Sequence, residues 1–416
     1  MSLSTRGVTA LAAVAEPVAS PVGFVRRRWH LIGPERHPVA AELLARSAGM
    51  RAACATWPPH PAGTAVLVGS AFHWRDNAML LDGIAAARRD GGRLVLLHLG
   101  GGGGSLLRVA AKEHPSLETL AIELPPDPPP RAVRVAVALA NHAGEYGGEL
   151  RVDAAGRVSR AAWKAVELPQ PTAPPRASAP ESVLVTGGLG GLGIRVAGVL
   201  AASCGLHPVL VDAASPAELP ADAAAHLTRL LGGAAGATVV TADLTDPQRL
   251  ATALGTTGAP PVRAVVHCAG LLHGRQLDGF TSHDLSLAQL AKVDGLRNVL
   301  AAVDPLRLRH LITFGSITAE IPHRSMASYA LANELLRRET LRAAPGLPRC
   351  ATVAGQWSLW SGAGMAHRAG AVGQARRMGM TPVSLRAGMS ALLRLLCWPS
   401  GPERATALIL RGEDLR

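Results

Sequence analysis

The stretch "VLVTGGLGGLGIRVAGVL", residues 183–200, decides the fold of this chain. An apolar run typical of a buried parallel strand leads into a glycine-rich turn, and a helical pattern follows. Glycine lets a backbone turn tightly and approach a pyrophosphate, which then rests on the N-terminal amides of the helix. The order T-G-x-x-x-G-x-G between strand and helix therefore predicts a dinucleotide-binding turn. Its residues are Thr186, Gly187, Gly188, Gly191, Leu192 and Gly193.

The rest of the C-terminal half continues the alternation of strand and helix. Short apolar runs predict strands, and stretches with helical periodicity lie between them. Alternation of this kind is typical of a doubly wound parallel sheet. The strands are predicted at 183–186, 208–211, 237–241, 263–267 and 309–314, and the helices at 192–203, 222–232, 284–303 and 327–343.

The N-terminal half repeats the pattern without recognisable catalytic groups. Its turn "GGGGG" (100–104) lacks the lysine and the serine or threonine of a phosphate-binding loop, so we expect a flexible connection between strand and helix. We interpret this half as structural. Strands are predicted at 64–70, 92–100 and 117–124, and helices at 77–89 and 105–115.

These patterns predict an α/β protein with two Rossmann-like doubly wound subdomains. Residues 61–167 form the structural subdomain without a cofactor, and residues 182–416 form the cofactor-binding catalytic one. The segment "LPQPTAPPRASAPE" (168–181) is rich in proline and alanine and is interpreted as the linker. Residues 1–60 are expected to be a lead-in whose alanine-rich start is mobile. A weak signal peptide is the alternative for that start.

Composition narrows the function classes. Five cysteines scattered singly in 416 residues predict neither a disulfide framework nor a zinc site, which favours the reducing cytoplasm, and no metal site is expected. No apolar run predicts a membrane span. The net charge of +12 indicates an anionic partner. The chain has no nucleic-acid-binding signature, and an anionic cofactor or an acidic carrier protein would use the same charge.

A candidate reaction centre follows the predicted fifth strand. "LITFGSITAE" (311–320) ends its apolar run at Ser316, and Tyr329 begins a predicted helix 13 residues later. A serine hydroxyl can polarise a carbonyl oxygen while a tyrosine donates a proton and a nicotinamide supplies hydride. In many carbonyl-reducing sites a lysine four residues after the tyrosine lowers the phenol pKa. Here Asn333 holds that position.

Acidic and small residues at the other strand ends predict further cofactor contacts. Asp212 ends the second strand, where a carboxylate accepts hydrogen bonds from ribose hydroxyls, favours NAD and repels a 2′-phosphate. A loop aspartate facing water is the alternative. Asp243 and Leu244 follow the third strand, where an acid can hold the adenine. Ala269 and Gly270 in "HCAGLL" (267–272) let the chain pass close to the cofactor.

With these motifs the chain resembles the short-chain dehydrogenase/reductase superfamily, and within it the ketoreductase domain of polyketide synthases. In that group the lysine comes from an earlier helix, in a segment similar to "AKVDGLRNVL" (291–300). "LLRVAAKEHPSLETLAIEL" (106–124) and "AGQWSLWSGAGMA" (354–366) also resemble the group. The resemblance implies that Lys292 supports the phenol of Tyr329 and that Ser316 holds the carbonyl. Asn333 then serves a water relay or orients Lys292.

The resemblance implies reduction of a β-ketoacyl thioester on an acyl carrier protein to a β-hydroxyacyl group with NADPH, with other synthase domains as further partners. The family places an arginine after the second strand, whereas this chain has "VDAASP" (211–216), which makes NADH the alternative. A reductase of free polycyclic ketones and a silent scaffold remain alternative functions. Both stereochemical markers of the family are missing. We expect a discrete reductase or one excised domain.

Overall fold

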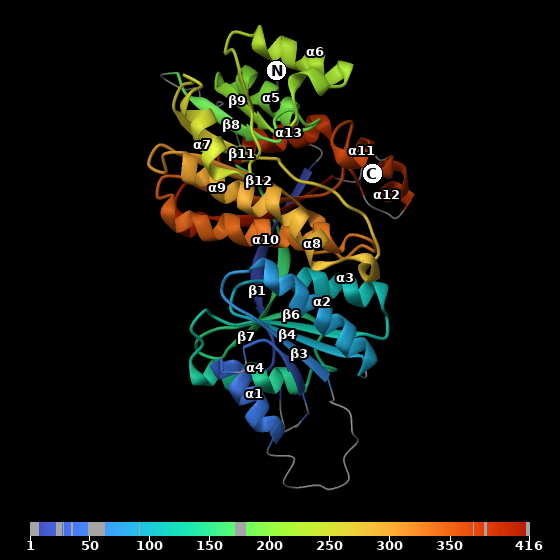
Figure 1. Ribbon diagram of the computed structural model, residues 1–416. Coiled ribbons are helices and arrows are strands. Elements are labelled where there is room, and N and C mark those ends of the chain that lie inside the picture. The colour runs from blue at the N-terminus through green and yellow to red at the C-terminus, as the bar shows by residue number, and fades with distance from the viewer. Residues whose placement is uncertain are drawn as a thin grey trace.

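A computed structural model describes residues 8–21, 27, 29–34, 36–48, 63–90, 92–170, 180–368, 370–377 and 381–412. Fourteen strands form one continuous sheet with the order β10-β9-β8-β11-β12-β13-β16-β1-β7-β6-β5-β4-β3-β2. Figure 1 shows this sheet running through two α/β halves, each covered by helices. The α/β class with Rossmann-like halves, predicted from the sequence, is confirmed.

In the later half, the strand that precedes the glycine turn lies in the interior of the sheet. Strand β8 (Ser182–Thr186) lies between β9 (His207–Asp212) and β11 (Val262–His267), all parallel. The strand order reverses at this point, and ligands of such sheets bind at the carboxyl ends there. The other elements are α5 (Gly193–Cys204), α6 (Ala221–Leu231), β10 (Thr238–Thr241), α7 (Pro247–Gly255), α8 (Ser282–Gln289), α9 (Gly295–Ala302), β12 (His310–Ser316), α10 (Ala327–Ala343), β13 (Ala351–Trp357), β14 (Trp360–Ser361), α11 (Met365–Arg368), α12 (Ala371–Arg377), β15 (Val383–Ser384), α13 (Leu385–Leu395) and β16 (Thr406–Gly412).

The earlier half has a mainly parallel sheet whose central strands β3 and β4 are buried on both faces. In β3 every residue is buried, as expected for a strand covered by helices on each side. Strand β7 runs antiparallel to its two neighbours, β6 and β1. The elements are β2 (Trp29–Ile32), α1 (Pro38–Ala48), β3 (Gly63–Val68), α2 (Trp74–Arg89), β4 (Arg93–His98), α3 (Gly104–Glu113), β5 (Glu118–Glu123), α4 (Pro130–Asn141), β6 (Gly148–Val152) and β7 (Val158–Val166).

Strand β1 (Val8–Pro17) joins the two halves, and the expectation of a mobile start is wrong for it. Its residues pair antiparallel with β16 on one side and with β7 on the other, so it lies in the interior of the sheet. Its partners are far along the chain, so nothing local in the alanine-rich sequence marks the pairing. The predicted division at 168–181 remains a prediction, and residues 171–179 of that segment lie outside the described residues.

Most predicted elements occur within a few residues of their expected positions, and α10 occupies its predicted range. The predicted helix 284–303 is interrupted. Between α8 and α9, residues Leu290–Asp294 form a π-helical segment, labelled η3, in which the turn is one residue wider. Among the described residues, no helix has the length and apolar composition that crossing a membrane requires.

Candidate active site

The glycine turn after β8 has room for backbone only. Gly187 has φ +61°, and a Cβ atom there would lie 3.0 Å from Ala269. A Cβ atom on Gly193 would lie 2.1 Å from the Gly187 carbonyl oxygen. Helix α5 then begins after Leu192 without a side-chain cap. The amides of Ile194 and Arg195 donate to the carbonyls of Gly190 and Leu192, both at 3.1 Å. The positive end of the helix dipole favours an anion here, which fits the pyrophosphate of a dinucleotide.

Asp212 lies directly against this turn. Its Oδ2 accepts a hydrogen bond from the Leu189 amide at 3.0 Å, and its Oδ1 accepts one from the Ala214 amide at 3.1 Å. A carboxylate offers about four acceptor sites, so two remain for ribose hydroxyls. Asp243 is exposed and accepts from the amide and hydroxyl of Thr245, both at 2.8 Å.

Lys292 is buried at the centre of the site, in the π-helical segment η3. Its side chain is 2% exposed, and its Nζ donates to the carbonyl oxygens of Phe314 at 3.0 Å and Ala269 at 3.3 Å. The same Nζ lies 5.9 Å from the centre of the Tyr329 ring. A Cβ atom on Gly270 would lie 2.7 Å from Lys292 Cε, so glycine makes room for the lysine there.

His267, which the sequence analysis missed, connects the π-helical segment to the cofactor turn. Its Nε2 donates to the Lys292 carbonyl at 2.9 Å, so its Nδ1 accepts from the Thr186 hydroxyl at 2.8 Å. Burial lowers the pKa of His267 to about 3, so the ring is neutral at pH 7. A histidine at the end of a buried strand beside the predicted cofactor turn was the available signal.

Tyr329, Asn333 and Ser316 meet at the start of α10. The Asn333 Nδ2 donates to the Tyr329 carbonyl at 2.7 Å, while the Asn333 Oδ1 is buried without a partner among the described atoms. Ser316 ends β12, and its Oγ accepts from the Thr318 hydroxyl at 3.0 Å. An unpaired buried amide oxygen is costly, so it marks a place for a water or substrate donor.

The two proton-bearing groups titrate away from their usual values because they are buried. Burial lowers the pKa of Lys292 to about 8. Burial also raises the pKa of Tyr329, although hydrogen bonding with Asn333 and Ser316 acts in the opposite direction. The phenol pKa therefore does not have the lowered value expected beside a lysine.

The structure brings all four predicted reaction-centre residues together, from three separate elements. Lys292 comes from η3, Ser316 from β12, and Tyr329 and Asn333 from α10. Ala269 adjoins them because its carbonyl accepts from Lys292 Nζ at 3.3 Å, and its amide in turn approaches Thr186 Oγ1 at 3.4 Å. Leu244 is buried, and its carbonyl accepts from Asn298 at 2.8 Å, which fixes the chain beside Asp243.

One group of described residues has the spacing of a metal site, and it lies outside this centre. His98, Glu123 and Glu149 bring their ligand atoms within 4.8 Å of one another. Arg338 pairs with Glu123 at 3.1 Å and with Glu149 at 2.7 Å. The carboxylates are therefore neutralised by arginine, and the cluster is explained as an ion-pair network.

The chain is similar to proteins of a known family over the residues that form this site. The family model of the KR domain matches residues 181–362. These residues are a KR domain. The match begins one residue before β8 and covers the glycine turn, Lys292, Ser316 and all of α10. KR domains belong to the short-chain dehydrogenase/reductase superfamily and use a nicotinamide cofactor.

Relatives of known function are large synthases. The naringenin synthase of Pestalotiopsis fici is 33% identical over 199 residues, which cover 46% of this chain and 7% of that enzyme. Polyketide synthase GfsA of Streptomyces halstedii is 31% identical over 293 residues, which cover 69% of this chain and 4% of that protein. The chain thus spans a small part of the length of the curated relatives it matches.

Solved structures extend the similarity to nearly the whole chain. A ketoreductase from the first module of phoslactomycin biosynthesis in a Streptomyces species has a TM-score of 0.75 at 23% identity, covering 97% of this chain and 93% of that one. An A-type ketoreductase from a modular polyketide synthase has a TM-score of 0.73 at 24% identity, covering 99% and 94%. At this identity the likeness establishes the fold, including the KR domain's companion half.

Proposed function

We propose that the chain is a ketoreductase of the polyketide synthase type, which reduces a β-ketoacyl thioester on an acyl carrier protein to the β-hydroxyacyl thioester. The observation that carries this proposal is the convergence of Lys292 with Tyr329, although the two residues lie 37 positions apart in the chain. They meet beside a glycine turn built for a dinucleotide. A nicotinamide bound at that turn supplies the hydride.

The residues of the chain then handle the carbonyl oxygen. The Ser316 hydroxyl donates a hydrogen bond to it, which favours the charge that develops as the ketone is reduced. The Tyr329 hydroxyl transfers its proton to the same oxygen. Because burial raises the phenol pKa, Tyr329 is protonated at pH 7 and ready to act as the acid.

Lys292 stabilises the phenolate that this transfer leaves behind. Its pKa of about 8 keeps most of the side chain charged at pH 7, and its ammonium group lies beside the Tyr329 ring. Asn333 contributes a buried amide oxygen without a partner among the described atoms. We propose that this oxygen holds a water through which the phenolate recovers its proton from solvent.

NADPH and NADH are the two candidate cofactors for this site. The family resemblance favours NADPH, whereas the carboxylate of Asp212 beside the glycine turn favours NADH, because it repels a 2′-phosphate. The net charge of +12 suits either anion and also an acidic carrier protein. The matching relatives include modular synthases, so other synthase domains are further candidate partners.

The test is a nicotinamide absorbance assay with a β-ketoacyl pantetheine thioester and a free cyclic ketone, each run with NADPH and NADH. We expect oxidation with the thioester and slower turnover of the free ketone. Absence of oxidation with either cofactor would contradict the reductase function and favour the silent scaffold. Faster turnover of the free ketone would favour the alternative substrate class. Activity with NADPH alone would contradict the role given to Asp212.

A further inference from the structure

Helix α3 of the earlier half lies against the catalytic half along its whole length. Figure 1 shows it between the sheet of its own half and helices α8 and α10. The sequence analysis assigned no chemistry to this half and expected the pentaglycine turn before α3 to be flexible. The structure contradicts that expectation, because Gly101–Gly104 are buried and the Gly103 amide donates to Glu334 of α10.

The N-terminus of α3 holds a carboxylate from the catalytic helix. Glu334, which is 0% exposed, accepts hydrogen bonds from the Gly103 amide at 3.1 Å and the Ser105 amide at 2.8 Å. The start of a helix favours an anion. Glu334 directly follows Asn333, so this contact fixes the turn of α10 that carries the buried amide.

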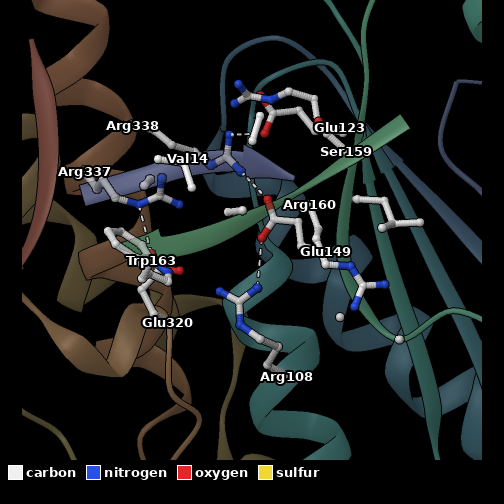
Figure 2. A pocket seen from close by; sticks show the side chains of 17 residues that line it. Val14, Arg108, Glu123, Glu149, Ser159, Arg160, Trp163, Glu320, Arg337 and Arg338 are labelled. Carbon is white, nitrogen blue, oxygen red and sulfur yellow. Dashed lines mark hydrogen bonds and ion pairs between the residues drawn. The ribbon is translucent and has the colours of Figure 1, made fainter. Parts of the chain in front are cut away.

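The middle of α3 reaches the segment that connects Ser316 to Tyr329. Arg108 donates to the Ala319 carbonyl and pairs with Glu149 at 2.9 Å. Figure 2 shows Arg108 and Arg338 approaching Glu149 from opposite sides. Ala319 lies three residues after Ser316, so Arg108 fixes the start of this segment.

The C-terminus of α3 holds the other end of the same segment. Glu113 Oε1 accepts from the Ser325 amide and Oε2 accepts from the Leu277 amide, each at 2.7 Å. Ser325 has φ +63°, in the left-handed region that a residue other than glycine rarely adopts. The Arg275 amide also donates to the Ser325 carbonyl at 3.0 Å. One carboxylate thus joins two loops of the catalytic half.

We propose that Glu113 is a positioning residue of the reductase site: by holding the loops at Leu277 and Ser325 together, it sets the placement of Tyr329 relative to Ser316 for the substrate ketone. The inference rests on the proposed function. The physical reason is that a connection without long helices or strands samples many conformations unless it is fixed. Glu113 fixes this connection at Ser325, which lies three residues before Ser328 and four before Tyr329.

Glu113→Gln and Glu113→Ala test the proposal, with Glu145→Gln as the matched control. Glutamine keeps one acceptor oxygen and alanine keeps none, whereas Glu145 is an exposed glutamate of the same half that pairs only with His142 among the described residues. We expect kcat/KM for the β-ketoacyl thioester to fall about 10-fold in Glu113→Gln and about 100-fold in Glu113→Ala, because small misplacements of reacting groups cost rate. Cofactor affinity should be unchanged, since the hydrogen bonds described for α3 reach α10 and the loops at Ala319, Leu277 and Ser325 rather than the glycine turn.

Hydrogen exchange gives a readout that does not depend on activity. Amides at 274–280 and 317–326 should exchange faster in both Glu113 variants, while amides of β8 and β11 keep their wild-type protection. Wild-type exchange of the two loops in Glu113→Gln, or an unchanged kcat/KM in either variant, would overturn the proposal. If the wild-type chain reduces no ketone, faster loop exchange still supports the positioning contact and only the reductase function fails. Glu113→Gln carries the test if Glu113→Ala does not fold.

Discussion

At the scale of single residues, the candidate site has an asparagine in the helix position where many carbonyl-reducing sites have a lysine, and its lysine comes from another segment. Asn333 takes the helix position one turn after Tyr329, and Lys292 enters from η3. Lys292 lies within the π-helical segment, where the helical turn is one residue wider than in an α-helix. The Lys292 carbonyl is satisfied by His267 and its ammonium group by two further carbonyls. Buried polar groups that are satisfied in this way hold one side-chain orientation.

Tyr329→Phe should lower the turnover of a β-ketoacyl thioester by about 10²–10⁴-fold, the range associated with a positioned acid. Cofactor affinity should persist, because the phenol is not part of the glycine turn. Single-turnover kinetics and fluorescence titration of the nicotinamide measure the two effects. Tyr146→Phe is the matched control, because Tyr146 is the only other tyrosine and donates to the Ala19 carbonyl in the earlier half. Normal turnover by Tyr329→Phe would show that the proton donor lies elsewhere.

Lys292→Met should change how stability depends on pH. Burial lowers the lysine pKa from 10.5 to about 8, so below pH 8 the folded protein bears the full cost of the buried charge. Between pH 8 and 10.5 the folded lysine loses its proton while the unfolded one keeps it, so wild-type stability rises relative to the variant. Between pH 7.5 and pH 10 the rise should be about 2 kcal/mol. Urea unfolding of both proteins at pH 7.5 and pH 10 measures it, and a constant difference would contradict the buried charge.

Lys292 and Tyr329 were predicted as partners from the resemblance to polyketide synthase ketoreductases, and the rarity of both residue types in this chain supported that assignment. Three lysines and two tyrosines occur in 416 residues, so a spacing that joins one of each is informative. Glu113, Arg108 and Glu334 were not predictable. Glutamate and arginine are common, and the contacts of these residues cross between halves that are far apart in sequence. No local pattern distinguishes them from exposed charges.

At the scale of elements, β1 determines how the two halves become one sheet. Its residues 8–12 pair with β16 and its residues 10–17 pair with β7, so residues 10–12 have partner strands on both sides. Its alanines give no strong strand propensity, and its neighbours in sequence do not pair with it. The prediction failed here because the strand is specified by its partners. Helix α10, by contrast, was predicted over its full range because its own sequence carries the periodicity.

Ala12→Pro should therefore destabilise the whole protein. Ala12 faces Leu408 of β16 and Lys164 of β7, and proline removes a ladder donor from an interior strand. We expect a loss of about 3 kcal/mol in the free energy of unfolding. Ala12→Ser, which keeps the amide, should change it by less than about 1 kcal/mol. Chemical denaturation measures both. A proline variant as stable as the wild type would mean that β1 is dispensable.

At the scale of the whole molecule, the halves share a sheet and a buried ion-pair network. Arg338 of α10 pairs with Glu123, Glu149 and Glu334, at 3.1, 2.7 and 3.0 Å. Figure 2 shows Arg338, Glu123 and Glu149 among the side chains that line a cavity between α10 and the strands β1, β6 and β7, and the volume of this cavity is about 440 Å³. The arginine holds the pKa of Glu334 down at about 2 despite its burial. Arg338 thus neutralises carboxylates from both halves of the molecule.

Arg338→Met should destabilise the protein by about 3–5 kcal/mol, because it leaves the buried carboxylate of Glu334 and the half-buried carboxylates of Glu123 and Glu149 without their common partner. Arg342→Met is the matched control, one helical turn later. Arg342 is 41% exposed and pairs with Glu339 at 2.9 Å, so its loss should cost less than about 1 kcal/mol. Thermal unfolding compares the two variants. Equal effects would contradict the view that the network couples the halves.

The sequence predicted two similar halves and the division of chemistry between them, because each half repeats strand and helix signals locally. It did not predict that the earlier half supports the reaction centre directly. That support depends on α3, which offers its N-terminus, Arg108 and Glu113 to three separate points of the catalytic half. Contacts of this kind exist only in the folded molecule.

The most direct measurement combines a β-ketoacyl acyl carrier protein with the reduced nicotinamide deuterated at the transferred position. Intact-mass spectrometry then follows the carrier-bound chain. If the chain is a ketoreductase acting on carrier-bound substrates, the acyl group gains one deuterium and one proton, and Tyr329→Phe suppresses the gain while Tyr146→Phe does not. A carrier-bound chain of unchanged mass in the presence of both NADPH and NADH would contradict the account.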